Sequence, residues 1–424
     1  MHVRPVEGEQ RVTPLELFFD LVFVFAITQV TGFLAANESG EGLLRGGLLL
    51  AVLWWAWAAY AWLTNTLDPE EGGVRLVVFA TTAAMLIVAL ATPAAFGAEA
   101  LVFAVAYFIV RALHLVLYAI AGRDDPELFA AVLRFAPGAV IGPSLLVIAA
   151  FFDGTVEIGL WVAALTVDYL SALVGRGRGW RLSPAHFVER HGLIIIIALG
   201  ESIVAIGVGA AGLPLDAARI AAALLGMVVA AALWWSYFDW VIFTSQARIT
   251  DAQGAERANL ARDLYTYLHM PMVFGIVLFA LGMKETLAHV DEPLGIIPAI
   301  GLCGGLALYM AAHVAHRLRT GGGWGHGRPT ATVVLLALIP VATMVPALAA
   351  LALAAAVCVA LIAYEAIRYR GARAWIRSHR GEFTMEEVRR IAPQTGAVPA
   401  DPDPSTDPNA DRAAAIINPD PKEG

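Results

Sequence analysis

Charged residues are scarce in this sequence. Asp, Glu, Lys and Arg make up 15% of its 424 residues, whereas 59% are hydrophobic. A soluble domain would have roughly a quarter charged residues, so the composition argues against a water-soluble fold. The formal net charge of −8 comes largely from the C-terminal tail and acidic loops, and we expect no nucleic-acid partner.

Cysteine and catalytic motifs are also nearly absent. Cys303 and Cys358 both fall inside apolar runs, so no disulfide framework is expected. The chain has no GxSxG, HExxH or CxxC motif, and the glycine-rich segment GGGWGHG (321–327) lacks the Lys-Ser/Thr pair of a phosphate-binding loop. We therefore expect no enzyme activity, no cofactor and no metal site.

Long apolar runs dominate the rest of the chain. Runs of 18 or more apolar residues are typical of helices that span a lipid bilayer. The first run carries Glu16 and Asp20 and lacks the features of a cleavable signal peptide, so we expect it to be retained. The pattern predicts an all-α polytopic membrane protein with about 12 transmembrane helices, at 14–36, 43–64, 74–96, 98–121, 132–152, 156–174, 187–210, 217–244, 263–283, 294–317, 329–345 and 347–368.

The basic residues predict the orientation. With twelve spans, all of the 28 Lys and Arg residues lie on the side of the two termini except Arg45, Arg111, Arg219 and Lys284. Cytoplasmic loops are enriched in Lys and Arg, so we expect both termini to be cytoplasmic. The expected organisation is a cytoplasmic N-terminus (1–13), a six-helix repeat (14–174), a basic linker (175–186), a second six-helix repeat (187–368) and a largely disordered cytoplasmic tail (369–424). A short helix is expected in the tail, near 383–391.

Two halves of the chain show weak internal similarity. LWWAWAAYAWLT (53–64) matches LWWSYFDWVIFT (233–244), and YFIVRALH (107–114) matches YMAAHVAH (309–316). Thr13-Pro14 and Ser183-Pro184 open the first and seventh spans in the same way. This order of matches predicts a 6+6 internal repeat with both halves in the same orientation, although chance similarity between apolar helices is the alternative explanation.

The first span, TPLELFFDLVFVFAITQVTGFL (13–34), contains two acids four residues apart. At 100° per residue Glu16 and Asp20 share one stripe of the helix, and the corresponding stripe of the seventh span contains His186 and Arg190. Because unpaired charges are costly in hydrocarbon, we predict that the acids pair with His186 and Arg190 across the interface between halves. The deeper part of this interface is predicted to be apolar, with constriction candidates Phe23, Ile27, Ile194 and Ile197. Such pairs could serve transport or only helix packing, and the sequence leaves both open.

Glu201 lies deeper in the seventh span, in HGLIIIIALGESIVAIG (191–207). Arg111, in the middle of the fourth span, is the partner that we expect for it. The alternative is a neutral, protonated carboxyl, and alternation between the two states would suit a proton- or cation-coupled carrier. His114, His313 and His316 are interpreted as interfacial histidines, and Asp239 as the partner of an interfacial arginine.

LELFFDLVFVFAITQV (15–30) and HFVERHGLIIIIALGESIVAIG (186–207) resemble the signatures of the bacterial low temperature requirement A family, over about residues 11–370. The resemblance implies a multi-pass protein of the bacterial cytoplasmic membrane with a role in cold or stress adaptation, but it does not define a molecular activity. The residues that match the family motifs are Glu16, Phe19, Asp20, His186, Glu189, Arg190, Gly192, Gly200, Glu201 and Ser202.

FFDLVFVFAIT (18–28) is also similar to the stretch that opens the first helix of lysosomal-type potassium channels, although Phe19 replaces their Ser. That likeness implies a pore of four six-helix units, which would need two copies of this chain, a homodimer. Three hypotheses remain: a transporter of an unknown small solute or ion, with a charge-lined pathway between the halves, a cation channel, and a membrane sensor or scaffold that transports nothing.

Overall fold

The computed structural model describes residues 11–174 and 177–378. Within this part the chain is helical and contains no β-sheet; one isolated bridge pairs Pro293 with Pro346 and joins two loops at one end of the bundle. The predicted all-α architecture is therefore confirmed. The short helix expected near 383–391 lies outside the described residues, as does most of the tail.

The first group of helices comprises six long helices and two short 3₁₀ turns. Its members are α1 (Pro14–Ala36), α2 (Gly40–Thr64), α3 (Gly72–Ala91), η1 (Thr92–Ala94), α4 (Ala100–Ala121), η2 (Gly122–Asp124), α5 (Pro126–Ala149) and α6 (Gly154–Ser171).

The second group contains three continuous helical runs that are interrupted by π-helical turns. Its members are α7 (Pro184–Ala210), α8 (Ala217–Ser236), η3 (Tyr237–Val241), α9 (Ile242–Asp251), α10 (Gly254–Ala261), η4 (Arg262–Tyr267), α11 (His269–Ala288), α12 (Ile296–Ala299), η5 (Ile300–Gly304), α13 (Gly305–Arg319), α14 (Gly327–Ala342), α15 (Ala347–Arg368) and α16 (Arg370–Ser378). π turns frequently occur at functional sites.

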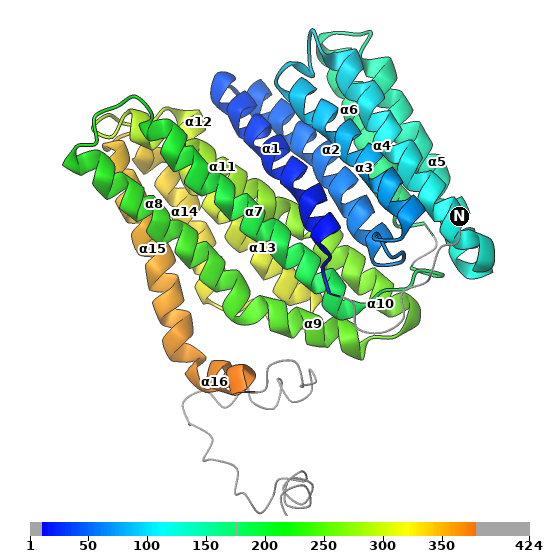
Figure 1. The fold of residues 1–424 in the computed structure, drawn as a ribbon. Helices are drawn as coiled ribbons and strands as arrows, with labels where there is room; N and C mark the ends of the chain where they lie inside the picture. Colours follow the sequence, from blue (N-terminus) through cyan, green and yellow to red (C-terminus); the bar gives the residue numbers. More distant parts are fainter. Residues whose placement is uncertain (1–10, 175–176, 379–424) are drawn as a thin grey trace, which may run out of the picture.

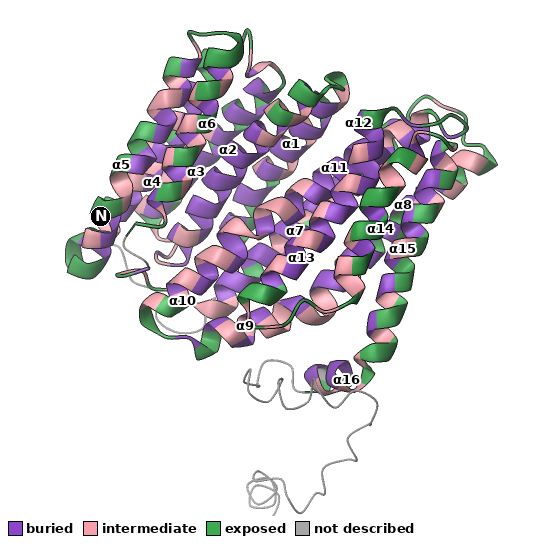
Figure 2. Ribbon diagram, turned by 180° about the vertical axis from the view of Figure 1, so that it is seen from behind, coloured by how far each residue is buried: buried purple, intermediate pink, exposed green. Residues whose placement is uncertain are grey.

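The two groups lie side by side, with α1 against α7 and α11 where they meet (Figure 1). In the first group α1 packs on α2 and α3, and the contacts continue from α3 through α4 and α5 to α6. In the second group α7 packs on α8 and α11, and the contacts continue through α13 and α14 to α15. Buried residues concentrate on α1, α2, α7, α11 and α13, and exposed ones on the outer helices (Figure 2).

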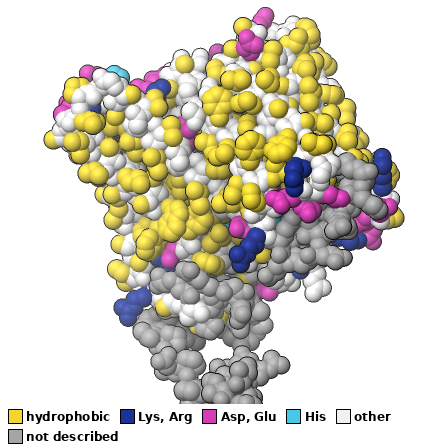
Figure 3. All heavy atoms as spheres, in the orientation of Figure 1, with side chains coloured by type: hydrophobic (Ala, Val, Ile, Leu, Met, Phe, Trp, Pro, Cys, Tyr) yellow, Lys and Arg dark blue, Asp and Glu magenta, His cyan; other side chains and the backbone are white. Residues whose placement is uncertain are grey.

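The surface is that of a membrane protein. Ten of the described helices are long and apolar enough to cross a bilayer. Apolar side chains cover much of the flank in Figure 3, while Lys and Arg side chains gather toward the end where α9, α10 and α16 lie. The expected count of twelve spans is not confirmed, because α6, which carries Glu157 and Asp168, is not among the ten, and α14 has 16 residues.

Two predicted spans are longer in the structure than the sequence analysis expected. The helical run that begins at Ala217 ends at Asp251, not at 244, and the next run begins at Gly254, not at 263. The extra residues form α9 and α10, which are not apolar on average and so give no signal in a hydropathy search. Much of the segment expected to be a basic loop is therefore a helical hairpin, with a turn at Gly254 (φ +52°).

The backbones of α11 and α13 meet directly. A Cβ atom at Gly275 would lie 2.5 Å from the carbonyl oxygen of Gly305, and one at Gly282 would lie 2.4 Å from the backbone nitrogen of Leu302 in η5. Small residues allow this approach, as they do in many membrane helix pairs. Side chains larger than glycine have no room at these two positions.

Candidate functional site

The site lies where α1 meets α7, and we call it the α1–α7 seam; it comprises Glu16, Asp20 and Thr28 of α1 and His186, Arg190 and Glu201 of α7. Both helices begin with a hydroxyl residue followed by proline, a suitable first helical residue. On α1 the Thr13 hydroxyl accepts the backbone N–H of Glu16, and the Glu16 carboxylate accepts that of Thr13. This capping box fixes the start of α1 and the orientation of the first acid.

Asp20 and Arg190 form a two-pronged ion pair across the seam. Arg190 donates from Nη1 to Oδ2 of Asp20 at 2.8 Å and from Nη2 to Oδ1 at 3.0 Å. The Trp57 indole of α2 donates a third hydrogen bond to Oδ1 at 2.9 Å. Both charged side chains are at most 1% exposed, so this planar fork-to-carboxylate geometry is the strong kind of ion pair.

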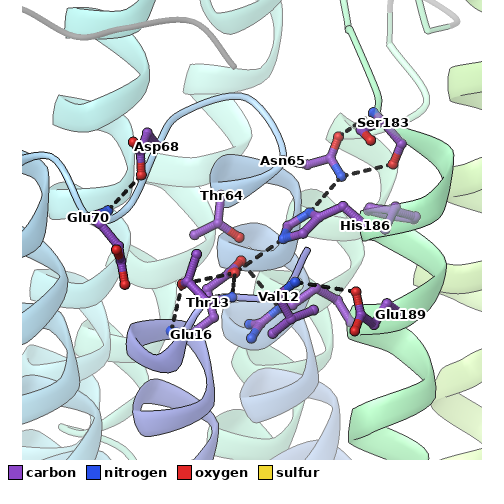
Figure 4. Close-up of polar contacts among 12 residues, drawn as sticks. Val12, Thr13, Glu16, Thr64, Asn65, Asp68, Glu70, Ser183, His186 and Glu189 are labelled. Atoms are coloured by element: carbon purple, nitrogen blue, oxygen red, sulfur yellow. Dashed lines mark hydrogen bonds and ion pairs between the residues drawn. The ribbon is translucent and has the colours of Figure 1, made fainter. Parts of the chain in front are cut away.

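Glu16 and His186 form the second pair, nearer the helix ends (Figure 4). His186 Nε2 lies 3.1 Å from Oε2 of Glu16, and its Nδ1 lies 3.0 Å from the Asn65 side-chain amide. Asn65 in turn accepts the backbone N–H of Ser183 at 2.6 Å, just before α7. The end of α2 therefore orients the imidazole.

The structure places the two predicted pairs in contact, and it links them. Arg190 Nε is 3.7 Å from Oε1 of Glu16, so one guanidinium lies close to both acids. Glu189, a candidate from the sequence, does not belong to the seam: its side chain is exposed and accepts the backbone N–H of Val12 at 3.2 Å (Figure 4). Trp57 and Asn65 were missed, because the sequence shows only an aromatic-rich helix and a polar residue at its end.

Glu201 faces α1 farther along the seam. It is the eighteenth residue of α7, about 25 Å along the axis from Pro184 at 1.5 Å per residue. Its carboxylate accepts the Thr28 hydroxyl at 2.5 Å, and within the described residues no Lys, Arg or His pairs with it. The predicted pairing with Arg111 is therefore wrong. The neighbouring Ser202 is fully buried, and its hydroxyl finds no partner in the described part of the chain.

Arg111 pairs inside the first group instead. Its Nη2 donates to Oδ1 of Asp168 on α6 at 2.9 Å, and the Tyr107 hydroxyl lies 3.4 Å from the other oxygen. His114, one turn along α4, lies 3.1 Å from the carbonyl of Ala59 on α2. The mid-span position of Arg111 in the sequence could not show which helix it faces, because that depends on how α4 packs in the bundle.

The expected apolar layer lies between the ion pairs and Glu201. Phe23, Ile27 and Ile194 are at most 4% exposed and belong to the main hydrophobic core, and Ile197 is half-buried against it. Phe19 packs between Phe23 and Tyr60 with tilted rings, at ring-centroid distances of 5.2 and 5.0 Å. Apolar side chains thus separate the charged end of the seam from its deep carboxyl.

Four histidines of the second group are buried and lie near one another: His191, His269, His313 and His316. The interpretation of His313 and His316 as interfacial histidines did not anticipate this cluster. His191 and His269 have ring centroids 5.5 Å apart, and His269 and His316 are 6.0 Å apart. His269 Nδ1 lies 2.8 Å from the carbonyl of Leu264, so it donates there, and its Nε2 accepts the Tyr237 hydroxyl at 2.8 Å. The sequence signal that could have indicated this cluster is a tyrosine four residues before a histidine, which occurs at 265–269 and 309–313.

The remaining candidate, Asp239, lies in π turn η3. It pairs with Arg373 of α16 at 3.0 Å, so the predicted arginine partner of Asp239 is confirmed. Arg373 also contacts Glu365 of α15 at 3.1 Å. These contacts attach α16 to the end of the second group.

Sequences related to this chain cover most of its length. A chain of Rhizobium meliloti described as an uncharacterized protein is 30% identical over 312 residues, which is 70% of this chain and 74% of that one. No solved structure matches. The family model of the bacterial low temperature requirement A protein matches residues 11–363, which include both helices of the seam and all six of its residues. The chain therefore belongs to the bacterial low temperature requirement A protein family.

Proposed function

We propose that this protein is a membrane transporter whose pathway follows the α1–α7 seam. The observation that carries the proposal is the concentration of ionisable groups there: Glu16, Asp20, His186, Arg190 and Glu201 are each at most 2% exposed and all face the partner helix. Ionisable side chains are expensive inside a membrane and commonly mark solute or ion pathways.

The geometry of the seam favours a role in transport over a role in helix packing alone. A buried ion pair is often no more stabilising than apolar residues of the same size, so helix packing alone does not require this one. Glu201 has a hydroxyl as its partner and no cation, which allows the carboxyl to gain or lose a proton without breaking an ion pair. In our proposal Glu201 couples the binding of a proton or cation to the movement of solute along the seam, and the two ion pairs close the pathway at its basic end.

We infer further that the halves form a 6+6 repeat of parallel units, with α1–α6 as the first unit and α7–α15 as the second. The supporting observation is that helices pack in the same order in both groups, the last helix of each group contacting the second: α6 on α2, and α15 on α8. Two cavities also support the repeat. His114 lines one cavity, and His316 lines the other. These two histidines occupy the same position in the matching segments 107–114 and 309–316. We place the basic end, and with it both termini, in the cytoplasm of a bacterial cell, on the basis of the positive-inside rule.

Reconstitution into liposomes tests the proposal. The purified chain would be tested for solute-dependent proton movement with an enclosed pH-sensitive dye, across a panel of small solutes and cations. We expect saturable flux that is lost in Glu201→Gln and kept in Glu189→Gln, a matched control on the same helix whose side chain lies outside the seam.

Other outcomes would support the competing hypotheses. Large, non-saturating cation currents that respond to voltage would favour the channel, in which two copies of the chain supply four units. Absence of flux across the panel, with the protein folded, would favour a sensor or scaffold. Flux that is equal in Glu201→Gln and the wild type would remove Glu201 from the mechanism.

A further inference from the structure

A cavity of about 210 Å³ lies at the basic end of the second group, where α13 ends and α14 begins. We call it the arginine cavity. Arg317 of α13, Arg328 of α14 and Arg373 of α16 line it together with His313 and His316, and Glu365 is the one carboxylate among its lining residues. The cavity is smaller than the roughly 300–1,000 Å³ of pockets for drug-sized ligands, so it suits a small molecule.

Two of the arginines already hold a carboxylate. Arg328 donates from Nε to Oε1 of Glu365 at 2.8 Å and from Nη2 to Oε2 at 3.2 Å, and Arg373 donates to Oε2 at 3.1 Å. Planar guanidinium groups are suited to two-point recognition of carboxylate and phosphate. The wall of the cavity therefore has the geometry that binds an oxyanion.

Arg317 adds a third guanidinium to the cavity. Within residues 11–174 and 177–378 no carboxylate forms an ion pair with it. The glycine-rich loop packs on its side chain: a Cβ atom at Gly322 would lie 2.7 Å from Cγ of Arg317, and the loop turns through positive φ at Gly321 (+84°) and Gly325 (+66°). The loop that does not fit a nucleotide-binding motif therefore positions an arginine.

His313 supplies an unused hydrogen-bonding group on the inner wall. The side chain is 1% exposed, and neither ring nitrogen has a hydrogen-bond partner among the described residues. Buried polar groups are normally paired with protein or water. An unpaired imidazole on the wall of a cationic cavity is therefore suited to a ligand that accepts a hydrogen bond.

We propose that the arginine cavity binds a small oxyanion, a phosphate or carboxylate group, between Arg317, Arg328 and His313. Arg317 supplies a guanidinium, Arg328 the Nη1 group that is not bonded to Glu365 or Ser236, and His313 an N–H from the inner wall. None of the residues of the α1–α7 seam lines this cavity. The proposal goes beyond the transport function, because anion binding here does not depend on transport. The phosphate could come from a free anion or from the headgroup of an anionic lipid beside α16.

Titration calorimetry of the full-length protein in detergent tests the site. Inorganic phosphate and succinate would be titrated at constant ionic strength into the wild type, Arg317→Gln and Arg319→Gln. Arg319 is the matched control, since it lies two residues away on α13, pairs with Asp263 and does not line the cavity. We expect Arg317→Gln to weaken binding by about tenfold or more, as for the loss of a charged hydrogen bond, and Arg319→Gln to leave it unchanged.

Nanodiscs separate the two sources. If headgroups occupy the site, phosphatidylglycerol discs will weaken phosphate binding relative to phosphatidylcholine discs, and only in chains that retain Arg317. Equal affinity in both kinds of disc assigns the site to a soluble anion. Glu201→Gln is expected to bind the anion normally, so loss of flux and loss of this site are distinguishable.

The proposal is overturned if phosphate, succinate and phosphatidylglycerol all fail to bind saturably. It is also overturned if Arg317→Gln binds as the wild type does, or if both arginine variants lose affinity equally, which would indicate a general effect of surface charge.

Discussion

The two groups of helices pack in the same order but bury different polar groups. The first has regular α-helices and one fully buried ion pair, Arg111–Asp168. A cavity of about 70 Å³ lies between this group and the second group, lined by Trp55 and His114 on one side and by Ala258 and Arg262 on the other. The second group has three π turns, five buried histidines and the larger arginine cavity. In the described residues, no π turn occurs in the first group.

The difference shows that one packing plan accepts two chemistries. A π turn inserts an extra residue and shifts the side chains that follow it around the helix. In the second group η3 contains Tyr237, and η4 contains Tyr265 and ends at Tyr267, two residues before His269. Two of the π turns therefore lie in the segments that carry Tyr237, Tyr265 and His269.

The largest expected effect compares the ion pair between the groups with the one inside the first group. Arg190→Leu leaves two carboxylates, Glu16 and Asp20, without their guanidinium, whereas Arg111→Leu leaves only Asp168. We expect Arg190→Leu to lower the free energy of unfolding by about 3–5 kcal/mol or more, the usual cost of breaking a buried pair, and Arg111→Leu by less. Denaturant unfolding in detergent measures both.

Removing both partners provides the control for that comparison. Asp20→Leu combined with Arg190→Leu should recover much of the lost stability, because Asp20 no longer leaves an unpaired buried charge and Glu16 keeps its contact with His186. The comparison fails if Arg190→Leu is the milder single variant, or if the double variant loses the sum of two independent effects.

A smaller effect compares two buried tyrosines. Tyr237→Phe removes the donor to Nε2 of His269 and leaves that nitrogen unpaired, which should cost about 1–3 kcal/mol. Tyr60→Phe removes contacts to Thr81 and to the carbonyl of Val110, but the Thr81 hydroxyl still donates to the carbonyl of Val77, so we expect a loss of about 1 kcal/mol or less. The same unfolding assay would contradict the argument if Tyr60→Phe were the more damaging change.

The smallest effect concerns the caps of corresponding helices. Ser39 caps α2 and Asp216 caps α8. Hydrogen bonding from the backbone N–H of Arg219, together with its guanidinium, holds the pKa of Asp216 below its ordinary value of 3.8. The stabilisation is therefore complete above that ordinary value and is lost as the pH falls through the lowered pKa.

Asp216→Ser should remove this acid sensitivity and leave a cap like that of α2. The measurement is the melting temperature at pH 7 and pH 3, compared between the wild type and the variant. An unchanged pH dependence would show that the Asp216 cap contributes nothing to the acid sensitivity of α8.

The sequence predicted those features that depend on local periodicity. The stripe that carries Glu16 and Asp20, and its counterpart with His186 and Arg190, predicted which residues meet, because charges in an apolar helix must find partners. It also predicted the partner type of Asp239. These inferences needed helical geometry, the sign of charge and the alignment of the first span with the seventh.

Features that depend on which helices are neighbours could not be read in the same way. Arg111 was assigned to Glu201 because both lie in mid-span, but the order of helices in the bundle brings Asp168 to Arg111 instead. The helical hairpin of α9 and α10 was hidden by its polarity, and the π turns have no signature in hydropathy. Trp57 and Asn65 join the seam only because α2 lies beside it.

The glycine contacts between α11 and α13 have a consequence for motion. Where two backbones touch, no layer of side chains separates the helices, so α11 and α13 should move together as one rigid unit. Opening the seam would then require α1 and its neighbours to move away from that unit as a rigid body. The hydroxyl of Thr28 would leave Glu201 in the same step.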